Sequence, residues 1–438
     1  MAESQKIRCD VAVVGSGPGG ATVARDLTLG GADVVLLERG GDNPPRGNAV
    51  SAIKYVGGAG FLNKGVFITR EGYQIVRCLT LGGTSLMYLG CAWDPPSELM
   101  NRWGIDLTVE TAQIKQELPV GPLPDRLIGP RARALTDSAT SLGYDWKKIP
   151  KLVQADNCRT NCGSCMFGCP HKAKWHARDW VEDVRGKGLR VMTDTRCVQV
   201  TGKNGAVAGV TAFRGLNTRV EVEARAVVVA AGGVGSPGLL QRSGLTEAGD
   251  SFFFDPFIVV SGYVDGDFSP NREFPMATGM HLPEEGVMVT DMPVPWPVLA
   301  DNALFAKKPH RMLPAKNMVG LLVKVRDDME GSISADEKIG SKPLTPVDQA
   351  KLRLGEKISC RLLANIGAKN IWSSLPSAAH PGGTCRIGKV VDRNLETRIK
   401  NLFVADASVI PEPWGLPPTL TVLSLARRLS RHLFAEVL

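Results

Sequence analysis

The chain has 438 residues, of which 43% are hydrophobic and 22% charged, a composition typical of a globular protein with two or three domains. No segment approaches the roughly 18–20 consecutive apolar residues of a membrane span, and the N-terminus leaves no room for a signal peptide, so we expect a cytoplasmic protein. The net charge of +8 is spread along the chain, with no basic run among aromatic residues, which argues against nucleic-acid binding. Peripheral contact with a membrane stays open.

The first forty residues predict two strands joined by a glycine-rich turn and a helix. Apolar residues 11–14 form the first strand, residues 21–29 the helix, and residues 34–37 a second apolar strand that ends on Glu38. Three glycines in GxGxxG spacing lie between the first strand and the helix, and the acid follows about twenty residues later. This arrangement predicts a dinucleotide site.

Each glycine of this turn has its own expected role. Gly15 permits the tight turn, Gly17 lets backbone amides approach a pyrophosphate, and Gly20 lets the helix and strand pack closely. The helix N-terminus would stabilise the phosphate charge. Glu38 would accept hydrogen bonds from a ribose and repel a 2′-phosphate, so FAD or NAD fits better than NADP.

Four of the ten cysteines fall within twelve residues, at Cys158, Cys162, Cys165 and Cys169, with Pro170 after the last. Their gaps of three, two and three residues are close to the ferredoxin run, so we expect an iron–sulfur cluster, either [4Fe-4S] or [3Fe-4S]. Zinc held by four thiolates and a loop without metal are the alternatives. Disulfides are disfavoured in a reducing compartment.

The middle of the chain predicts a second domain. Strands are expected within residues 251–266 and 317–328, and a helix over residues 345–366. Residues 274–314, rich in Pro and Met, predict an irregular loop packed on this domain rather than a lid over the substrate. Towards the C-terminus, a buried strand ends on Asp406, at the edge where doubly wound sheets hold ligands.

Three further stretches resemble the glucose-methanol-choline (GMC) oxidoreductase family, a group of FAD enzymes. They are RCLTLGGTSLMYLGCAW, AAGGVGSPGLLQRSGL and HPGGTCRIGKVVDRNLETRIKNLFVADASVIP, which follow one another in the family's order. The resemblance implies an α/β fold with a Rossmann-like FAD-binding domain and an inserted α+β substrate-binding domain, as in the p-hydroxybenzoate hydroxylase architecture. The FAD-binding domain would comprise residues 1–250 and 379–438, with a cysteine-rich loop at 155–180, and the substrate-binding domain residues 251–378.

The same resemblance implies a set of cofactor-binding residues beyond Gly15, Gly17, Gly20 and Glu38. The set is Arg77, Gly82, Gly83, Thr84, Ser85, Asp406, Pro418 and Thr419. The last two begin a helix whose N-terminus would face the flavin.

The resemblance also implies that His380 is the catalytic base, since alcohol oxidation requires the loss of the hydroxyl proton and imidazole accepts protons near neutral pH. Relatives place a second His or Asn further along the chain, and Pro417 or Pro418 stands at that position here. Neither proline can donate or transfer a proton. Supporting polar groups are therefore sought among Glu412, Trp414 and Tyr88.

These features favour an FAD-dependent dehydrogenase that oxidises a CH–OH group of a small molecule. Electrons would pass through the iron–sulfur cluster to a protein carrier such as a ferredoxin, a cytochrome or a companion subunit. Two alternatives stay open: a flavin and iron–sulfur reductase or desaturase acting on a carbon–carbon bond, and a non-catalytic electron-transfer subunit.

Overall fold

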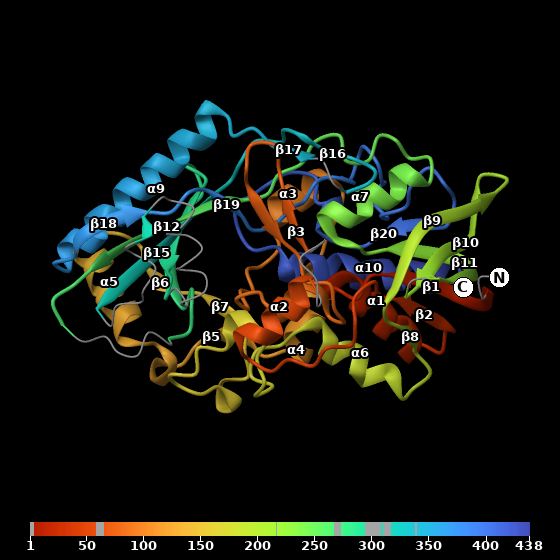
Figure 1. Ribbon diagram of the computed structural model, residues 1–438, viewed down its shortest axis with the longest axis horizontal. Helices are drawn as coiled ribbons and strands as arrows, with labels where there is room; N and C mark the ends of the chain where they lie inside the picture. Colours follow the sequence, from red (N-terminus) through yellow and green to blue (C-terminus); the bar gives the residue numbers. More distant parts are fainter. Residues whose placement is uncertain are drawn as a thin grey trace.

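Two large β-sheets organise the molecule, one at each end of its long axis (Figure 1). The computed structural model describes residues 4–57, 65–215, 217–266, 273–293, 308–309, 317–337 and 340–438. The first and last described residues lie at the same end, beside the first sheet (Figure 1). The expected α/β architecture with a Rossmann-like FAD-binding part is confirmed.

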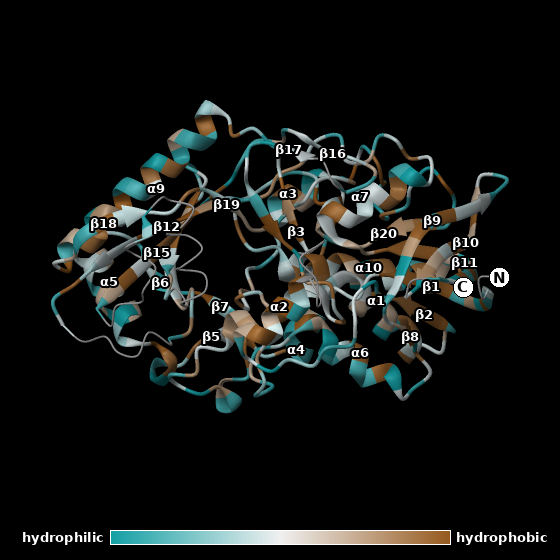
Figure 2. Ribbon diagram, viewed as in Figure 1, coloured by the Kyte–Doolittle hydropathy of each residue, from teal (hydrophilic) through white to brown (hydrophobic). Residues whose placement is uncertain are grey.

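The first sheet has seven strands in the order β8-β2-β1-β11-β10-β9, and β20 pairs with the end of β11. The strands are β1 (Ser4–Val14), β2 (Val34–Leu37), β8 (Arg190–Met192), β9 (Thr195–Lys203), β10 (Ala206–Arg214), β11 (Thr218–Val229) and β20 (Leu402–Val404). Strands β8, β2, β1, β11 and β20 run parallel, whereas β9 and β10 form an antiparallel extension. The carboxyl ends of the parallel strands are wholly buried, as their unbroken apolar sequences predict (Figure 2).

Helices pack against this sheet and against one another. They are α1 (Pro18–Leu29), α4 (Thr108–Glu117), α6 (Ala177–Arg185), α7 (Gly232–Arg242) and α10 (Thr419–Glu436). Helix α10 contacts both α1 and α4, although nearly the whole chain separates α1 from α10. The buried guanidinium of Arg427 on α10 joins the three helices, because it binds Asp26 of α1 and Glu117 of α4.

The second sheet has nine strands in the order β3-β4-β19-β12-β15-β14-β13-β6, with β18 also paired to β12. They are β3 (Val66–Ile68), β4 (Gln74–Val76), β6 (Lys147–Lys148), β12 (Pro256–Tyr263), β13 (Thr278–Leu282), β14 (Val287–Asp291), β15 (Met318–Val325), β18 (Lys369–Ser373) and β19 (Ser377–Ala378). Every residue of the central strand β15 is buried. Helices α5 (Pro130–Ser141) and α9 (Pro346–Asn365) pack together on this sheet, and a capping box between Thr345 and Asp348 begins α9.

The prediction of an irregular loop over residues 274–314 is wrong for the first part of this segment. Residues 278–291 form the antiparallel hairpin of β13 and β14, whose side chains alternate too weakly in polarity to signal strands because most of them are buried. Most of residues 294–314 lies outside the described residues. The second sheet also draws on segments before residue 250, since β3, β4 and β6 pair within it, and the domain boundaries proposed from the sequence stay a prediction.

Short elements complete the chain. They are α2 (Ala49–Gly57), α3 (Ser97–Arg102), the pair β5 (Val120–Pro122) and β7 (Pro150–Leu152), and the pair β16 (Ser332–Ile333) and β17 (Gly340–Ser341). Within the described residues, no helix is both long and apolar enough to cross a bilayer.

Candidate active site

A pocket of about 810 Å³ lies where the two sheets meet. Most of the residues predicted to bind a cofactor line it: Gly15, Gly17, Glu38, Arg77, Gly83, Thr84, Ser85, Asp406, Pro418 and Thr419. His380 lines the same pocket. Gly20 and Gly82 are not in its wall, and they act from behind the lining residues.

The glycine turn after β1 is built as the sequence predicts. Gly15 has a φ of +105°, and a Cβ there would lie 2.3 Å from the carbonyl oxygen of Ala230. A Cβ at Gly20 would lie 1.9 Å from the carbonyl oxygen of Gly15, so only glycine permits this approach of α1 to the strand. A Cβ at Gly17, in contrast, would meet no atom within 4 Å and would project into open space.

Ser16 connects the turn to β2 and to the next glycine loop. Its backbone N–H and its hydroxyl donate to the same carboxylate oxygen of Glu38, at 3.1 and 2.6 Å, and the N–H of Gly40 donates to the other oxygen at 2.8 Å. The N–H of Gly82 donates to the Ser16 hydroxyl at 2.9 Å. Burial raises the pKa of Glu38, while these donors oppose the rise.

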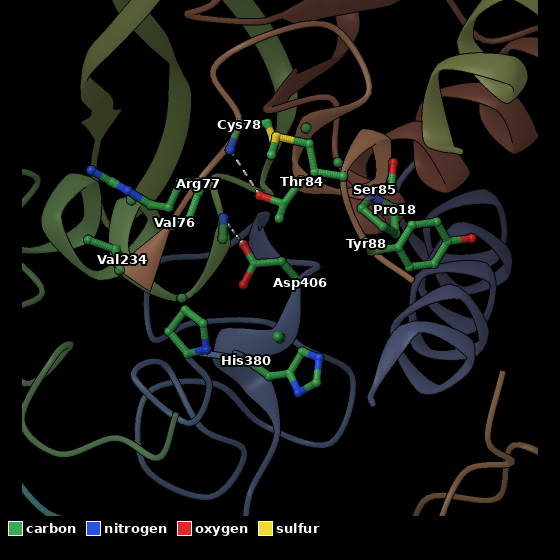
Figure 3. A pocket seen from close by; sticks show the side chains of 18 of the residues that line it. Pro18, Val76, Arg77, Cys78, Thr84, Ser85, Tyr88, Val234, His380 and Asp406 are labelled. Carbon is green, nitrogen blue, oxygen red and sulfur yellow. Dashed lines mark hydrogen bonds between the residues drawn. The ribbon is translucent and has the colours of Figure 1, made fainter. Parts of the chain in front are cut away.

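The loop from Arg77 to Ser85 forms one wall of the pocket (Figure 3). The hydroxyl of Thr84 accepts a hydrogen bond from the N–H of Cys78 at 3.2 Å, and the hydroxyl of Ser85 donates to the carbonyl of Gly82 at 2.6 Å. Arg77 pairs with Glu337 at 3.2 Å, and burial lowers the pKa of this guanidinium to about 10. Hydrogen bonds and an ion pair of the protein itself therefore hold this loop in place.

The C-terminal wall of the pocket comes from β20 and α10. Asp406 follows β20, and one of its carboxylate oxygens accepts from the N–H of Gly232 at 2.8 Å and from the hydroxyl of Ser236 at 2.5 Å. The carboxylate thus organises the first turn of α7 within the pocket wall (Figure 3). Pro418 and Thr419 bring the N-terminus of α10 to the pocket, where unpaired helix N–H groups favour negative charge.

His380 lies on the loop after β19 and keeps 28% of its side-chain surface exposed, on the pocket wall. Its backbone N–H donates to the carbonyl of Phe254 at 3.0 Å. Its ring Nδ1 lies 3.0 Å from a carboxylate oxygen of Asp255 and 3.4 Å from the ammonium of Lys324. Burial and the Lys324 charge lower the pKa of His380, so the ring is neutral at pH 7 and able to accept a proton.

Comparison with known proteins identifies the family. The GMC oxidoreductase profiles for the N-terminal and C-terminal parts match residues 55–258 and 317–426. The chain belongs to the GMC oxidoreductases. The relatives include an uncharacterized GMC-type oxidoreductase of Mycobacterium tuberculosis, 28% identical over 98% of this chain and 76% of the relative. A long-chain-alcohol oxidase of Arabidopsis thaliana is 24% identical over 98% of this chain and 68% of that protein.

Solved structures share the fold of this GMC oxidoreductase. Pyridoxine 4-oxidase from Mesorbium loti superposes with a TM-score of 0.77 at 20% identity, over 98% of this chain and 99% of the other. Formate oxidase from Aspergillus oryzae gives a TM-score of 0.75 at 15% identity, over 99% of both chains.

GMC oxidoreductases bind FAD, and the residues of this pocket fit that cofactor. The space in front of Gly17 that a Cβ would fill leaves room for a pyrophosphate at the N-terminus of α1. The buried carboxylate of Glu38 lies beyond this turn in the same pocket, as a ribose partner requires. The N-terminus of α10 and His380 supply the polar groups of the pocket towards the second sheet.

Pro417 and Pro418, where the resemblance led us to expect a second His or Asn, both line the pocket and make this part of its wall apolar. Of the three polar residues considered as substitutes, only Tyr88 lines it, and its hydroxyl donates to the carbonyl of Trp175 at 2.8 Å. Glu412 lies outside the lining and accepts hydrogen bonds from Trp103 and Arg102, and Trp414 is also outside it.

The cysteine loop is not arranged as a metal site. Across the described residues, no group of three or more His, Cys, Asp and Glu side chains could hold an ion, and the expected iron–sulfur cluster is not supported. Burial raises the pKa of Cys165 to about 12 and that of Cys158 to about 11, and the neighbouring cysteines of the run add to both rises. The spacing of the cysteines is close to that of a ferredoxin run, and the loop places Met166 and Phe167 in the pocket wall.

Several residues of the site were not found from the sequence. Lys324 lines the pocket beside His380, Asp255 contacts His380 from outside the lining, and Arg39, Arg242 and Glu337 line the pocket near Arg77. An apolar group also lines the pocket: Met166, Phe257, Met276, Met292 and Leu322. Lys324 is the one charged residue in the apolar strand MVGLLVKV, and this feature of the sequence could have indicated that Lys324 belongs to a functional site.

Proposed function

We propose that this GMC oxidoreductase oxidises the CH–OH group of a small apolar alcohol, with FAD as its cofactor. The observation that carries the proposal is the presence of His380 in the same pocket as the Gly17 turn and the N-terminus of α10. A base, an anion-binding turn and a second helix N-terminus are the groups that this reaction needs in one place.

His380 has the role of the general base. FAD, when bound, accepts the hydride that leaves the carbinol carbon. His380 takes the hydroxyl proton on its pocket-facing nitrogen, because Nδ1 lies against Asp255. Loss of the proton from the oxygen makes the departure of hydride from carbon favourable, and the product is the carbonyl compound.

The N-terminus of α10 stabilises negative charge that develops in the pocket, since its first N–H groups have no helical partner. The apolar side of the pocket excludes water, which strengthens this electrostatic effect. Methionines supply much of that wall, with Met166 from the cysteine loop and Met276 and Met292 from the second sheet region.

The methionine-rich wall of the pocket favours a substrate alcohol with an apolar body, because flexible methionine side chains adapt to such a ligand. The Arabidopsis relative is a long-chain-alcohol oxidase, which is consistent with the same chemical class. The solved structures with this fold are a pyridoxine 4-oxidase and a formate oxidase, so the fold alone does not determine the substrate.

For the electron acceptor, we propose a protein carrier, which makes the enzyme a dehydrogenase rather than an oxidase. The support is the cysteine loop, whose half-exposed residues reach the surface while Met166 and Phe167 line the pocket. A carrier docked on this loop would lie close to the flavin pocket. Measuring oxygen uptake against reduction of a soluble one-electron acceptor tests this part, and rapid stoichiometric oxygen uptake would overturn it.

The central experiment uses His380→Ala with a series of alcohols of increasing chain length. We expect the variant to retain FAD but to slow anaerobic bleaching of the flavin by about 10²- to 10⁴-fold, the usual effect of removing a positioned base. His432→Ala is the matched control, because that ring packs on Phe403 away from this pocket. An unchanged bleaching rate in His380→Ala would remove His380 from the mechanism.

A further inference from the structure

Two buried charged residues lie directly behind His380. The Asp255 carboxylate oxygen that lies 3.0 Å from the His380 Nδ1 also lies 3.3 Å from the ammonium of Lys324. Lys324 is itself 3.4 Å from Nδ1. Only 2% of each of the Asp255 and Lys324 side chains is exposed. The three groups form a compact cluster at the pocket wall.

The fold maintains this cluster against a substantial cost. Lys324 belongs to β15, a strand with every residue buried, and a charge in such a place costs several kcal/mol unless it is paired. Asp255 has a φ of +48°, a left-handed conformation that residues other than glycine rarely adopt. Its second carboxylate oxygen is buried and accepts no hydrogen bond from the described residues. Neither residue is explained by stability alone.

We propose that Asp255 and Lys324 are positioning residues for His380, and that together they replace the second polar group that is absent at Pro417 and Pro418. Asp255 accepts the Nδ1 proton, which leaves Nε2 unprotonated as the base. Lys324 pairs with the same carboxylate oxygen of Asp255, and its positive charge keeps the resting imidazole neutral. The inference rests on the proposed function, in which His380 is the base.

The cluster also accounts for the proton balance of the step. The O–H bond of the alcohol breaks and an N–H bond forms at Nε2, while the electron pair of the C–H bond leaves with the hydride to the flavin. His380 becomes positively charged and Asp255, already its Nδ1 partner, stabilises that charge. No bond to Asp255 or Lys324 is broken.

Other charged groups border the cluster and take part in its titration. Asp327 accepts hydrogen bonds from the N–H groups of Phe254 and Asp255 and pairs with the buried Lys342 at 3.0 Å. Burial lowers the pKa of Lys324, whereas Asp255, Cys91 and Asp327 raise it. Burial raises the pKa of Asp327 to about 7, while Lys342 opposes the rise.

His281, on strand β13 of the hairpin, also lies near the positive charge of Lys324. Burial, Lys324 and Arg326 lower the pKa of His281 to about 4, so it is neutral across the range in which the enzyme is tested. His281 therefore does not compete with His380 for a proton near pH 7.

The test observes His380 directly, by NMR of the FAD-loaded protein labelled with ¹⁵N-histidine. His380→Gln assigns the resonance among the six histidines. In the wild-type protein we expect the Nδ1–H tautomer and a pKa below the ordinary value of 6.5. A predominant Nε2–H tautomer in the wild type would overturn the inference without any variant of the cluster.

Variants then test the sign of each charge. Lys324→Met should raise the pKa of His380, and the acidic limb of kcat/KM should move to higher pH with it. Asp255→Asn should lower that pKa, weaken the tautomer preference, and reduce kcat/KM by about 10- to 100-fold, as expected for a group that orients a base. Shifts of the same sign, or no shift, would overturn the proposal.

Two further proteins separate this role from simple stability. The double variant Asp255→Asn with Lys324→Met removes one charge of each sign, so it keeps the buried charge balanced if a single variant fails to fold. It should lose the tautomer preference. Lys342→Met is the control, because it breaks a buried lysine–aspartate pair that does not touch His380 and should leave the tautomer unchanged.

The result can be told apart from failure of the proposed function. The tautomer and pKa of His380 are measured without substrate. If His380→Ala bleaches the flavin at the normal rate, the proposed function fails even when the NMR result is as expected.

Discussion

Ser16 and Glu38 are joined twice, because both the N–H and the hydroxyl of Ser16 donate to one oxygen of the Glu38 carboxylate. The hydroxyl also accepts from Gly82, so three segments of the chain meet at a single serine. The carboxylate thus shapes the turn from inside while it lines the pocket. Loss of Glu38 should affect FAD binding through both routes.

Glu38→Ala is expected to weaken FAD binding by about 10- to 100-fold, the value of a hydrogen bond or two to a charged group. Titration of the apoprotein with FAD, followed by flavin fluorescence, measures the effect. Glu223→Ala removes an exposed glutamate of β11 that pairs with Arg8 and serves as the control. Equal FAD affinity of the Glu38 variant and the wild type would place the ribose elsewhere.

Two alanine substitutions in one turn should have different consequences. Gly17→Ala adds a methyl group to open space, so we expect a folded protein with normal thermal stability and reduced flavin content. Gly20→Ala places a Cβ 1.9 Å from a backbone oxygen, so we expect the free energy of unfolding to fall by about 3 kcal/mol or more. Thermal unfolding and the ratio of flavin to protein distinguish the two variants. A destabilised Gly17→Ala variant would contradict the open space in front of Gly17.

Met292→Ala should reduce kcat/KM for an apolar alcohol by about 10-fold, mainly through KM, because it removes apolar contact without touching the base. Steady-state kinetics over a series of chain lengths measures this loss. Met192→Ala, at a buried methionine of β8 outside the pocket, is the control. A loss confined to kcat would show that Met292 positions the reacting atoms instead.

The Glu337 carboxylate should make stability depend on acid pH. Burial raises its pKa, but Arg39 and Arg77 outweigh burial and hold the pKa below its ordinary value of 4.5. The stabilisation is therefore present above about pH 4.5 and lost as the pH falls through the lowered pKa.

Glu337→Gln tests this directly by chemical denaturation at several pH values. The substitution removes the carboxylate that Arg39 and Arg77 share, so we expect the free energy of unfolding to fall by about 3–5 kcal/mol at pH 7. Below pH 4.5, the free energy of unfolding should depend less on pH in the variant than in the wild type. If the variant matches the wild type at pH 7, the arginines are paired by other groups.

Local patterns predicted the dinucleotide part of the fold well. The strand at residues 34–37, the turn glycines and the helix that follows Pro418 depend on neighbours in sequence, and all are found in the structure. The hairpin at residues 278–291 was missed because its strands are buried on both faces and lack alternation.

Only part of the site could be predicted from the sequence. His380 carried a motif around it, but Asp255 and Lys324 are 125 and 56 residues away from it and meet it only because β12 pairs with both β19 and β15. The cysteine run shows the limit of a spacing motif, since the spacing of thiols along the chain does not by itself establish a metal site, and the expected cluster is not supported.

The order of strands has a consequence for how the protein is made. Strand β1 lies at the centre of its sheet, while β20 and α10 come only after residue 400, complete that sheet and cover α1. During synthesis, β11 and α1 therefore leave the ribosome long before the strand and the helix that cover them. Until residues 402–436 have emerged, one edge of β11 and one face of α1 stay uncovered, and the cell has to protect them from association with other apolar surfaces.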